Sequence, residues 1–245
     1  MSDLSRFTFH VSRYALLCAI LVGCAIPQVP SHPIYEDPVN FVRLEKDARV
    51  LAEWPPSRHR HPAQVSAQDM AKVLRGFSVK VHRITLQRWF LGESVWEPVF
   101  REEEIQLLAP ALAEGMRKAA PDERLTFYLS QPITSMKREI TSGGLFVRED
   151  GVHFILGNHR FMYGIPAYGM VYDKRYPMAP TAPKGLDLAF HPSDAMVKPV
   201  RPIIDDIFGM VDDEVILDLA KIQAPETISR DQGATMFALA VSPDE

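Results

Sequence analysis

The stretch from Arg124 to Leu156 restricts the fold more than any other part of this sequence. It is rich in β-branched and aromatic residues, and Glu149-Asp150-Gly151 has the composition of a tight hairpin turn. Strands joined by such a short turn run antiparallel, so the sequence predicts an antiparallel sheet here. The expected strands are Leu125–Ser130, Arg138–Arg148 and Val152–Leu156.

Two segments before these strands have the pattern of amphipathic helices. Ser66 and Asp69 form a capping-box pattern ahead of apolar residues at helical spacing. Residues 100–120 carry an apolar stripe behind three glutamates in the first turn, and Pro110 predicts a kink or a new helix start. Since no strand–helix–strand rhythm repeats, we predict an α+β fold, a mostly antiparallel sheet with one or two packed amphipathic helices.

The composition is that of an ordinary globular protein. The 245 residues are 47% hydrophobic and 24% charged, which excludes a wholly disordered, collagen-like or coiled-coil chain. A net charge of −4 argues against nucleic acid as a partner. Two cysteines, Cys18 and Cys24, exclude a disulfide framework and a four-cysteine zinc site, and we predict neither a metal site nor a cofactor.

The amino terminus has the layered composition of a secretory signal. Arg6 and Arg13 stand in a basic head, and residues 15–22 form an uncharged apolar run too short to span a bilayer. We therefore predict a signal peptide at residues 1–23. A buried amino-terminal helix is the alternative, which Pro27 and the prolines after it disfavour.

Leu21-Val22-Gly23-Cys24 ends this apolar run and resembles the lipobox of bacterial lipoproteins. The resemblance implies cleavage before Cys24, a diacylglycerol on its sulfur and a further acyl chain, such as palmitate, on its amine. Three chains exceed the two that stable anchoring in membrane lipid needs. Ala25 in the next position implies the periplasmic face of an outer membrane in a two-membrane cell. A plain signal that leaves Cys24 unmodified is the alternative.

The remaining chain divides into three expected segments. Residues 24–62 hold many prolines and predict a Pro-rich tether and connector. Residues 63–219 form a single α+β domain, in which further short strands are expected near 186–190 and 215–219. Residues 220–245 are acidic, have weak periodicity and predict a loosely ordered tail.

The segment 161–177 is the candidate surface for a partner. Four of the seven tyrosines of the chain fall here, interleaved with Gly and Pro. Tyrosines in loops supply rigid contact area with a hydrogen-bonding tip. The predicted binding residues are Tyr163, Tyr168, Tyr172, Lys174, Arg175 and Tyr176, and the predicted partner is an envelope protein or glycan. The alternative is that the rings only hold a long loop onto the sheet.

Two other motifs favour structural interpretations. Arg58-His59-Arg60-His61 is interpreted as a solvated connector in preference to a lipid-phosphate contact or a His-x-His metal pair, because no third ligand stands at a recognisable spacing. Ser142-Gly143-Gly144 is interpreted as a glycine bulge in preference to an anion-binding nest, because it lacks the lysine of a phosphate loop.

These features predict a lipid-anchored envelope protein that binds a partner without catalysing a reaction, since no complete catalytic motif is present. A periplasmic hydrolase is one alternative, with a site around His153, His159 or the group Asp187, His191 and Asp194. An envelope assembly factor that offers a sheet edge to a client strand is another.

Overall fold

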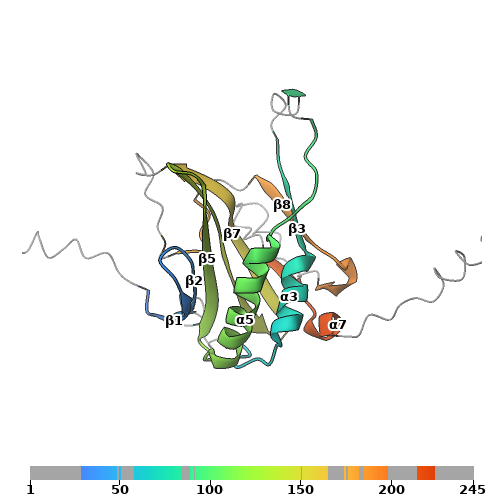
Figure 1. Cartoon of the computed structure of the whole chain (residues 1–245). Coiled ribbons are helices and arrows are strands. Elements are labelled where there is room, and N and C mark those ends of the chain that lie inside the picture. Colours follow the sequence, from blue (N-terminus) through green and yellow to red (C-terminus); the bar gives the residue numbers. More distant parts are fainter. Residues whose placement is uncertain are drawn as a thin grey trace, which may run out of the picture.

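The structure is a computed structural model that describes residues 29–48, 50, 58–83, 89–90, 92–149, 151–164, 174, 176–181, 185–197 and 214–223 (Figure 1). In chain order its elements are β1 (Ser31–Glu36), β2 (Phe41–Lys46), α3 (Ala67–Gly76), β3 (Phe77–Val81), β4 (Glu97–Pro98), α5 (Glu102–Lys118), β5 (Glu123–Thr134), β6 (Lys137–Arg148), β7 (Gly151–Gly164), β8 (Leu186–Phe190), the 3-10 helix η1 (Ser193–Ala195), β9 (Met196–Val197), β10 (Glu214–Leu217) and α7 (Leu219–Gln223).

Two antiparallel sheets organise the described part of the chain. The larger has seven strands in the order β1-β2-β5-β6-β7-β10-β9, and the smaller has the order β4-β3-β8. The predicted hairpin turn joins β6 and β7, with Arg148 paired to Gly151. The φ of Gly151 is 139°, a backbone conformation that favours glycine. A mostly antiparallel sheet with helices confirms the α+β class.

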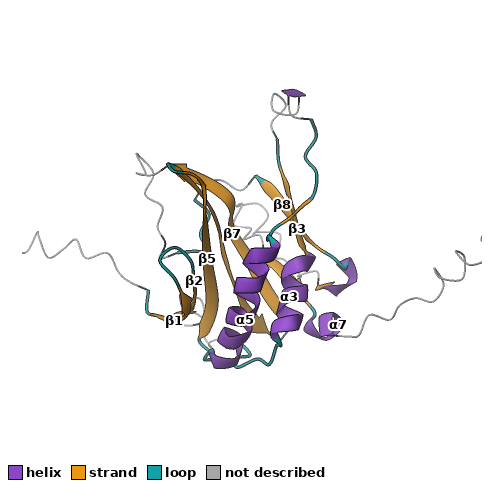
Figure 2. Cartoon of the chain, in the orientation of Figure 1, coloured by secondary structure: helices purple, strands orange, loops and turns teal. Residues whose placement is uncertain are grey.

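The helices α3 and α5 lie side by side in front of the large sheet (Figures 1 and 2). Ser66 caps α3 as the sequence predicted, since its Oγ accepts a hydrogen bond from the Asp69 backbone N–H at 3.0 Å. α5 passes through Pro110 as one helix, so the expectation of a second helix starting there is wrong. None of the helices in the described residues has the length and apolar character needed to cross a membrane.

Both faces of the large sheet are buried at the middle of β5, from Leu125 to Ser130. On β5, Leu125, Phe127 and Leu129 belong to the hydrophobic cluster that also contains side chains of α3 and α5. The alternate residues Thr126 and Tyr128 point to the opposite face, and each is 0% exposed. This opposite face, which we call the far face, is where the polar features described below are found.

The structure corrects the expectation that residues 24–62 form a tether. β1 and β2 lie in this range, pair with each other, and join the sheet through the pairing of β2 with β5. Val42 and Leu44 are buried in the main core. Pro33 is tolerated because β1 is an edge strand, where a missing N–H breaks no central ladder bond. The folded unit therefore begins by Ser31 and not at residue 63.

The two short strands expected near the carboxyl terminus are present, but the start of the expected tail is helical. β8 occupies the predicted 186–190, and β10 covers 214–217 in place of 215–219 because α7 begins at residue 219. The expected tail at 220–245 is therefore helical as far as Gln223. The rest of the tail, the signal peptide and Cys24 lie outside the described residues.

Candidate functional site

The far face carries a buried network of charges on two neighbouring strands. Glu45 on β2 is paired with Arg124 on β5, and Glu45 and Asp47 are each 1% exposed. Arg124 Nη1 lies 3.3 Å from Asp47 Oδ1, and its Nη2 lies 4.0 Å from Glu45 Oε2. Arg43 Nε donates to Glu45 Oε1 at 2.8 Å. Two carboxylates and two guanidiniums thus offset each other's charge inside the fold.

His59 joins this network from a separate part of the chain. Its Nε2 lies 3.0 Å from Asp47 Oδ2, its ring centroid lies 4.5 Å from that of Phe146, and its side chain is 0% exposed. The His59 backbone N–H donates to Pro121 O at 2.9 Å. The interpretation of residues 58–61 as a solvated connector is therefore wrong for His59, which an acidic partner and an aromatic ring bury. It is also wrong for His61, which is buried as well.

His61 lies beside His59 and is 6% exposed. Neither of its ring nitrogens makes a hydrogen bond to any of the described residues. Burial, followed by the nearby His59, lowers the pKa of His61 to about 4, so this imidazole is neutral at pH 7. The described residues contain no cluster of three or more His, Cys, Asp or Glu side chains placed to hold a metal ion.

A short segment, residues 174–181, covers the middle of the far face. We call its described residues, 174 and 176–181, the cover. Ser142 Oγ donates to Pro177 O at 2.7 Å, and Asn158 Nδ2 donates to Ala179 O at 3.2 Å. Arg43 Nη2 donates to Lys174 O at 2.8 Å. The cover is therefore fastened to β2, β6 and β7 through its backbone carbonyls.

Small residues in the sheet allow the cover to approach. A Cβ atom added to Gly157 would lie less than 3.0 Å from Pro177 O, and one added to Gly144 would meet the side chain of Met178. The pairing of β6 with β7 changes register here, but the extra residue lies on β7, since Ser142 pairs with Asn158 and Gly143 with Leu156 across Gly157. The pairing of β6 with β5 is regular through Ser142-Gly143-Gly144, so the glycine bulge predicted on that segment is wrong and the bulge is on the neighbouring strand. These positions thus serve close packing between strands and the cover.

Replacing Gly157 by alanine should push the cover away from the sheet. We expect a loss of about 1 to 3 kcal/mol in the free energy of unfolding, because the added methyl group meets backbone and not a flexible side chain. Urea denaturation measures this loss. The matched control is Gly185→Ala, where an added Cβ has no neighbour within 4 Å. Equal stabilities of the two variants would contradict this packing.

A cavity of about 390 Å³ lies between the charged network and the cover. Its volume falls in the usual range for small-molecule sites. Its walls combine a guanidinium–carboxylate pair, a tyrosine and apolar side chains. The lining residues are Asp47, Ala48, Arg124, Ile155, Tyr176, Met178, Ala179 and Pro180. Tyr176 is 43% exposed, so its ring is accessible to a ligand from solvent.

The structure describes three of the six predicted binding residues. Tyr176 lines the cavity, and Lys174 Nζ lies 5.0 Å from the centroid of the Tyr128 ring. Tyr163, near the end of β7, packs instead against the small cluster of Phe41, Tyr128 and Ile140, and its hydroxyl lies 3.5 Å from Ser130 Oγ. The others, Tyr168, Tyr172 and Arg175, lie outside the described residues.

The histidines considered for a hydrolase have separate partners. His153 Nδ1 lies 2.6 Å from Glu214 Oε1, and its ring stacks on Phe146. His159 Nε2 lies 3.5 Å from Glu97 Oε1, and its side chain is 2% exposed. Burial, followed by the adjacent Arg160, lowers the pKa of His159. Neither histidine lines the cavity of the far face.

The group Asp187, His191 and Asp194 also makes unrelated contacts. Asp187 pairs with His82 at 2.8 Å in an exposed ion pair. The His191 backbone N–H donates to Gly76 O, and Asp194 lies in η1. These contacts do not form a shared acid–base arrangement among the described residues.

The edge strand β1 bears on the assembly-factor alternative. It is the outer strand of the large sheet, and it contains Pro33 and a register shift between Pro33 and Tyr35. Proline and irregular pairing at an edge both disfavour addition of another strand. The opposite edge, β9, is two residues long.

Sequence reasoning missed Asp47 and Arg124, and it singled out His59 but interpreted it as solvated. The signal that could have identified Asp47 was the pattern of residues 41–47, in which apolar Val42 and Leu44 alternate with charged residues. That pattern predicts a strand with a charged face.

Comparisons with protein-family models, with curated proteins and with solved structures found no match. The cavity, the charged network and the amino-terminal motif are therefore the features that bear on function.

Proposed function

We propose that this protein is a lipid-anchored lipoprotein of the cell envelope that binds a glycan in the cavity under the cover. Acylated Cys24 holds it to the periplasmic face of an outer membrane, and residues 1–23 are its signal peptide. The amphipathic helices α3 and α5 pack on the face of the sheet that carries Leu125 and Phe127, and they keep the far face rigid. The lipobox-like motif at residues 21–24 supports the anchor.

The cavity beside Tyr176 is the observation that carries the binding proposal. At about 390 Å³ it suits one or two sugar rings better than the flat surface of a protein partner. A sugar has apolar C–H faces and hydroxyl edges. The Tyr176 ring can pack against the C–H face. Arg124 and the backbone of the cover can form hydrogen bonds with the hydroxyl groups.

Binding is favoured over catalysis because Asp47 and His59, the two groups that could act as an acid–base pair, are enclosed. A general base must reach the proton that it removes. Asp47 lines the cavity but its side chain is only 1% exposed, and the His59 side chain is 0% exposed and is not among the lining residues. We therefore propose that this pair holds residues 58–61 and Arg124 in position.

Replacing Tyr176 by alanine should abolish most glycan binding. We expect the Kd for oligomers of N-acetylglucosamine, or for soluble fragments of the envelope glycan, to rise at least about tenfold, because the only aromatic ring among the described lining residues is lost. Isothermal titration calorimetry measures the Kd.

The matched control for this experiment is Tyr176→Phe, which keeps the ring and removes the hydroxyl. It should bind within about threefold of the natural protein. Thermal melting should change little among the three proteins, since Tyr176 is 43% exposed. Unchanged affinity in Tyr176→Ala, or no glycan binding by the natural protein, would contradict the proposed site.

The anchor has its own test, which does not depend on the cavity. Mass spectrometry of the protein extracted from membranes should find Cys24 as the first residue, with lipid on its sulfur and its amine. Cys24→Ser should leave the membrane fraction or accumulate with residues 1–23 still attached. A bare Cys24 thiol in membrane-bound protein would contradict the anchor and leave the glycan site unaffected.

A further inference from the structure

A finger of the chain projects from one end of the molecule. It consists of residues 77–83 and 92–98, which include β3 and β4, with Trp89 and Phe90 at its tip (Figure 1). β3 pairs with both β4 and β8, and Val79 at the base is 0% exposed. The base of the finger is therefore part of the folded core.

The two arms of the finger are joined by hydrogen bonds. Arg83 Nη1 donates to Gly92 O at 2.9 Å and to Glu93 O at 3.3 Å. Ser94 Oγ donates to Val81 O. Gly92 has a φ of 72°, which favours glycine. The projection is thus held by specific contacts between its arms.

The tip of the finger exposes large apolar side chains. Trp89 is 79% exposed, Val95 78% and Phe90 70%, and these are the three largest exposures of large apolar side chains among the described residues. Trp96 is 48% exposed, and the rings of Trp89 and Phe90 lie 4.7 Å apart. Exposed apolar clusters of this kind mark interaction sites in folded proteins.

The chemistry of the finger matches a lipid surface. Residues 77–98 contain Lys80, Arg83 and Arg88 against Glu93 and Glu97, a net charge of +1, whereas the whole chain has a net charge of −4. Tryptophan favours the interface between lipid headgroups and acyl chains, and nearby cations are attracted to anionic headgroups. The finger projects from the body (Figure 1), so it can reach a fluid surface without a preformed pocket.

We propose that the tip of the finger inserts into the headgroup region of an anionic lipid bilayer. The contact involves no residue of the proposed anchor, and Figure 1 shows the finger at the end of the body opposite β1. Trp89 and Phe90 enter the interface, and the net positive charge of the finger favours anionic headgroups. The finger thereby fixes the orientation of the body at a membrane.

The fluorescence of Trp89 tests this contact directly. In the full chain with Trp54→Phe and Trp96→Phe, Trp89 is the sole tryptophan. Its emission should shift to shorter wavelength with vesicles of phosphatidylcholine and phosphatidylglycerol, and brominated lipids should quench it at least about twofold. Unshifted and unquenched emission would overturn the proposal, even if the chain attaches to vesicles elsewhere.

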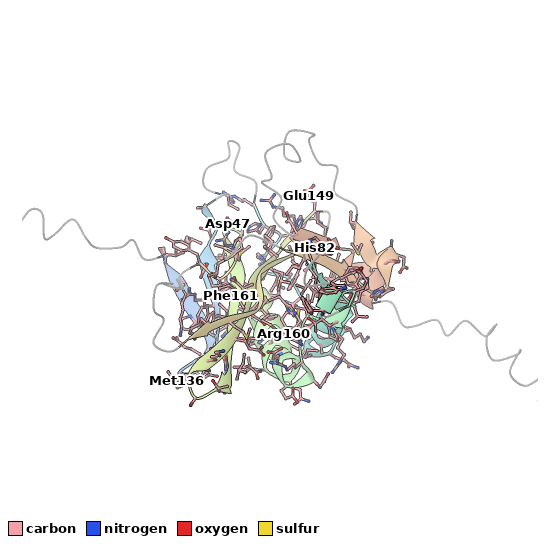
Figure 3. All side chains as sticks on the ribbon, turned by 90° about the horizontal axis from the view of Figure 1, so that it is seen from above. Asp47, His82, Met136, Glu149, Arg160 and Phe161 are labelled. Atoms are coloured by element: carbon pink, nitrogen blue, oxygen red, sulfur yellow. The ribbon has the colours of Figure 1, made fainter. Side chains whose placement is uncertain are left out.

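Co-sedimentation with the same vesicles adds a quantitative comparison. The Cys24→Ser chain carrying Trp89→Ser and Phe90→Ser should bind at least about tenfold more weakly than Cys24→Ser alone. The matched control is Met136→Ser, which removes a 64% exposed apolar side chain between β5 and β6 (Figure 3) and should change binding less than about twofold. If Met136→Ser weakens vesicle binding as much as the double variant of Trp89 and Phe90 does, the contact is not specific to the tip and the proposal is overturned. Binding to phosphatidylcholine vesicles as tight as binding to the mixed vesicles would also overturn it. Neither readout depends on acylation or on glycan binding.

Discussion

Asp47→Ala should lower the free energy of unfolding by about 3 to 5 kcal/mol, the usual cost of removing one member of a buried ionic network. The carboxylate is 1% exposed and lies within 3.3 Å of both His59 Nε2 and Arg124 Nη1. Its loss leaves the partly buried Arg124 guanidinium, 18% exposed, without one of its partners. It also releases His59, and with it residues 58–61, from the end of the sheet. Urea denaturation at pH 7 measures the change.

Asp122→Ala is the matched control for this experiment. Asp122 is also paired with a cation, Lys46, but both side chains are partly exposed, at 31% and 44%. Surface pairs of this kind contribute about 0 to 1 kcal/mol. Asp47→Asn should fall between the two alanine variants, because the amide oxygen still accepts a hydrogen bond. Similar stabilities for Asp47→Ala and Asp122→Ala would mean that the network is solvated in solution.

The strands β5 to β7 and the two main helices could be predicted because their signals are local. Alternation, a Gly-containing turn and a capping serine act over a few residues, and each specified the element in which it occurs. The strand β2 was missed although it alternates equally well. Prolines before and after β2 indicated a tether. The pairing of β2 with β5, which is far away in sequence, leaves β1 as the edge strand, and Pro33 is tolerated there.

The candidate site could be predicted only in part, for a similar reason. Clustered tyrosines pointed to the segment that contains Tyr176, which does line the cavity. The cavity itself needs Asp47 and Arg124 from two other strands, and no short motif links them. His59 and His61 lie in a basic, Pro-flanked run whose local composition is that of a solvated loop. Their burial depends on Asp47 and Phe146, so it follows from tertiary structure.

Between pH 7 and about pH 4, the natural protein should lose about 3 kcal/mol more stability than a His61→Leu variant. The pKa of His61 is about 4 in the folded chain, against an ordinary value of 6.5, because burial disfavours the charged imidazole. Below pH 6.5 the unfolded chain therefore binds a proton that the folded chain does not. Each pKa unit of difference is worth about 1.4 kcal/mol, so the unfolding free energy falls as the pH is lowered through this window.

Urea denaturation at a series of pH values measures this difference. Leucine fills a similar volume and removes two buried nitrogens that lack hydrogen bonds, so His61→Leu should be at least as stable as the natural protein at pH 7. The pKa of His159 is also lowered by burial, but its contribution is common to both proteins and cancels in their difference. Parallel stability curves would mean that His61 takes up its proton in the folded chain. In that case residues 58–61 open to solvent without unfolding, and the tie between His59 and Asp47 is too weak to position Arg124 at the cavity.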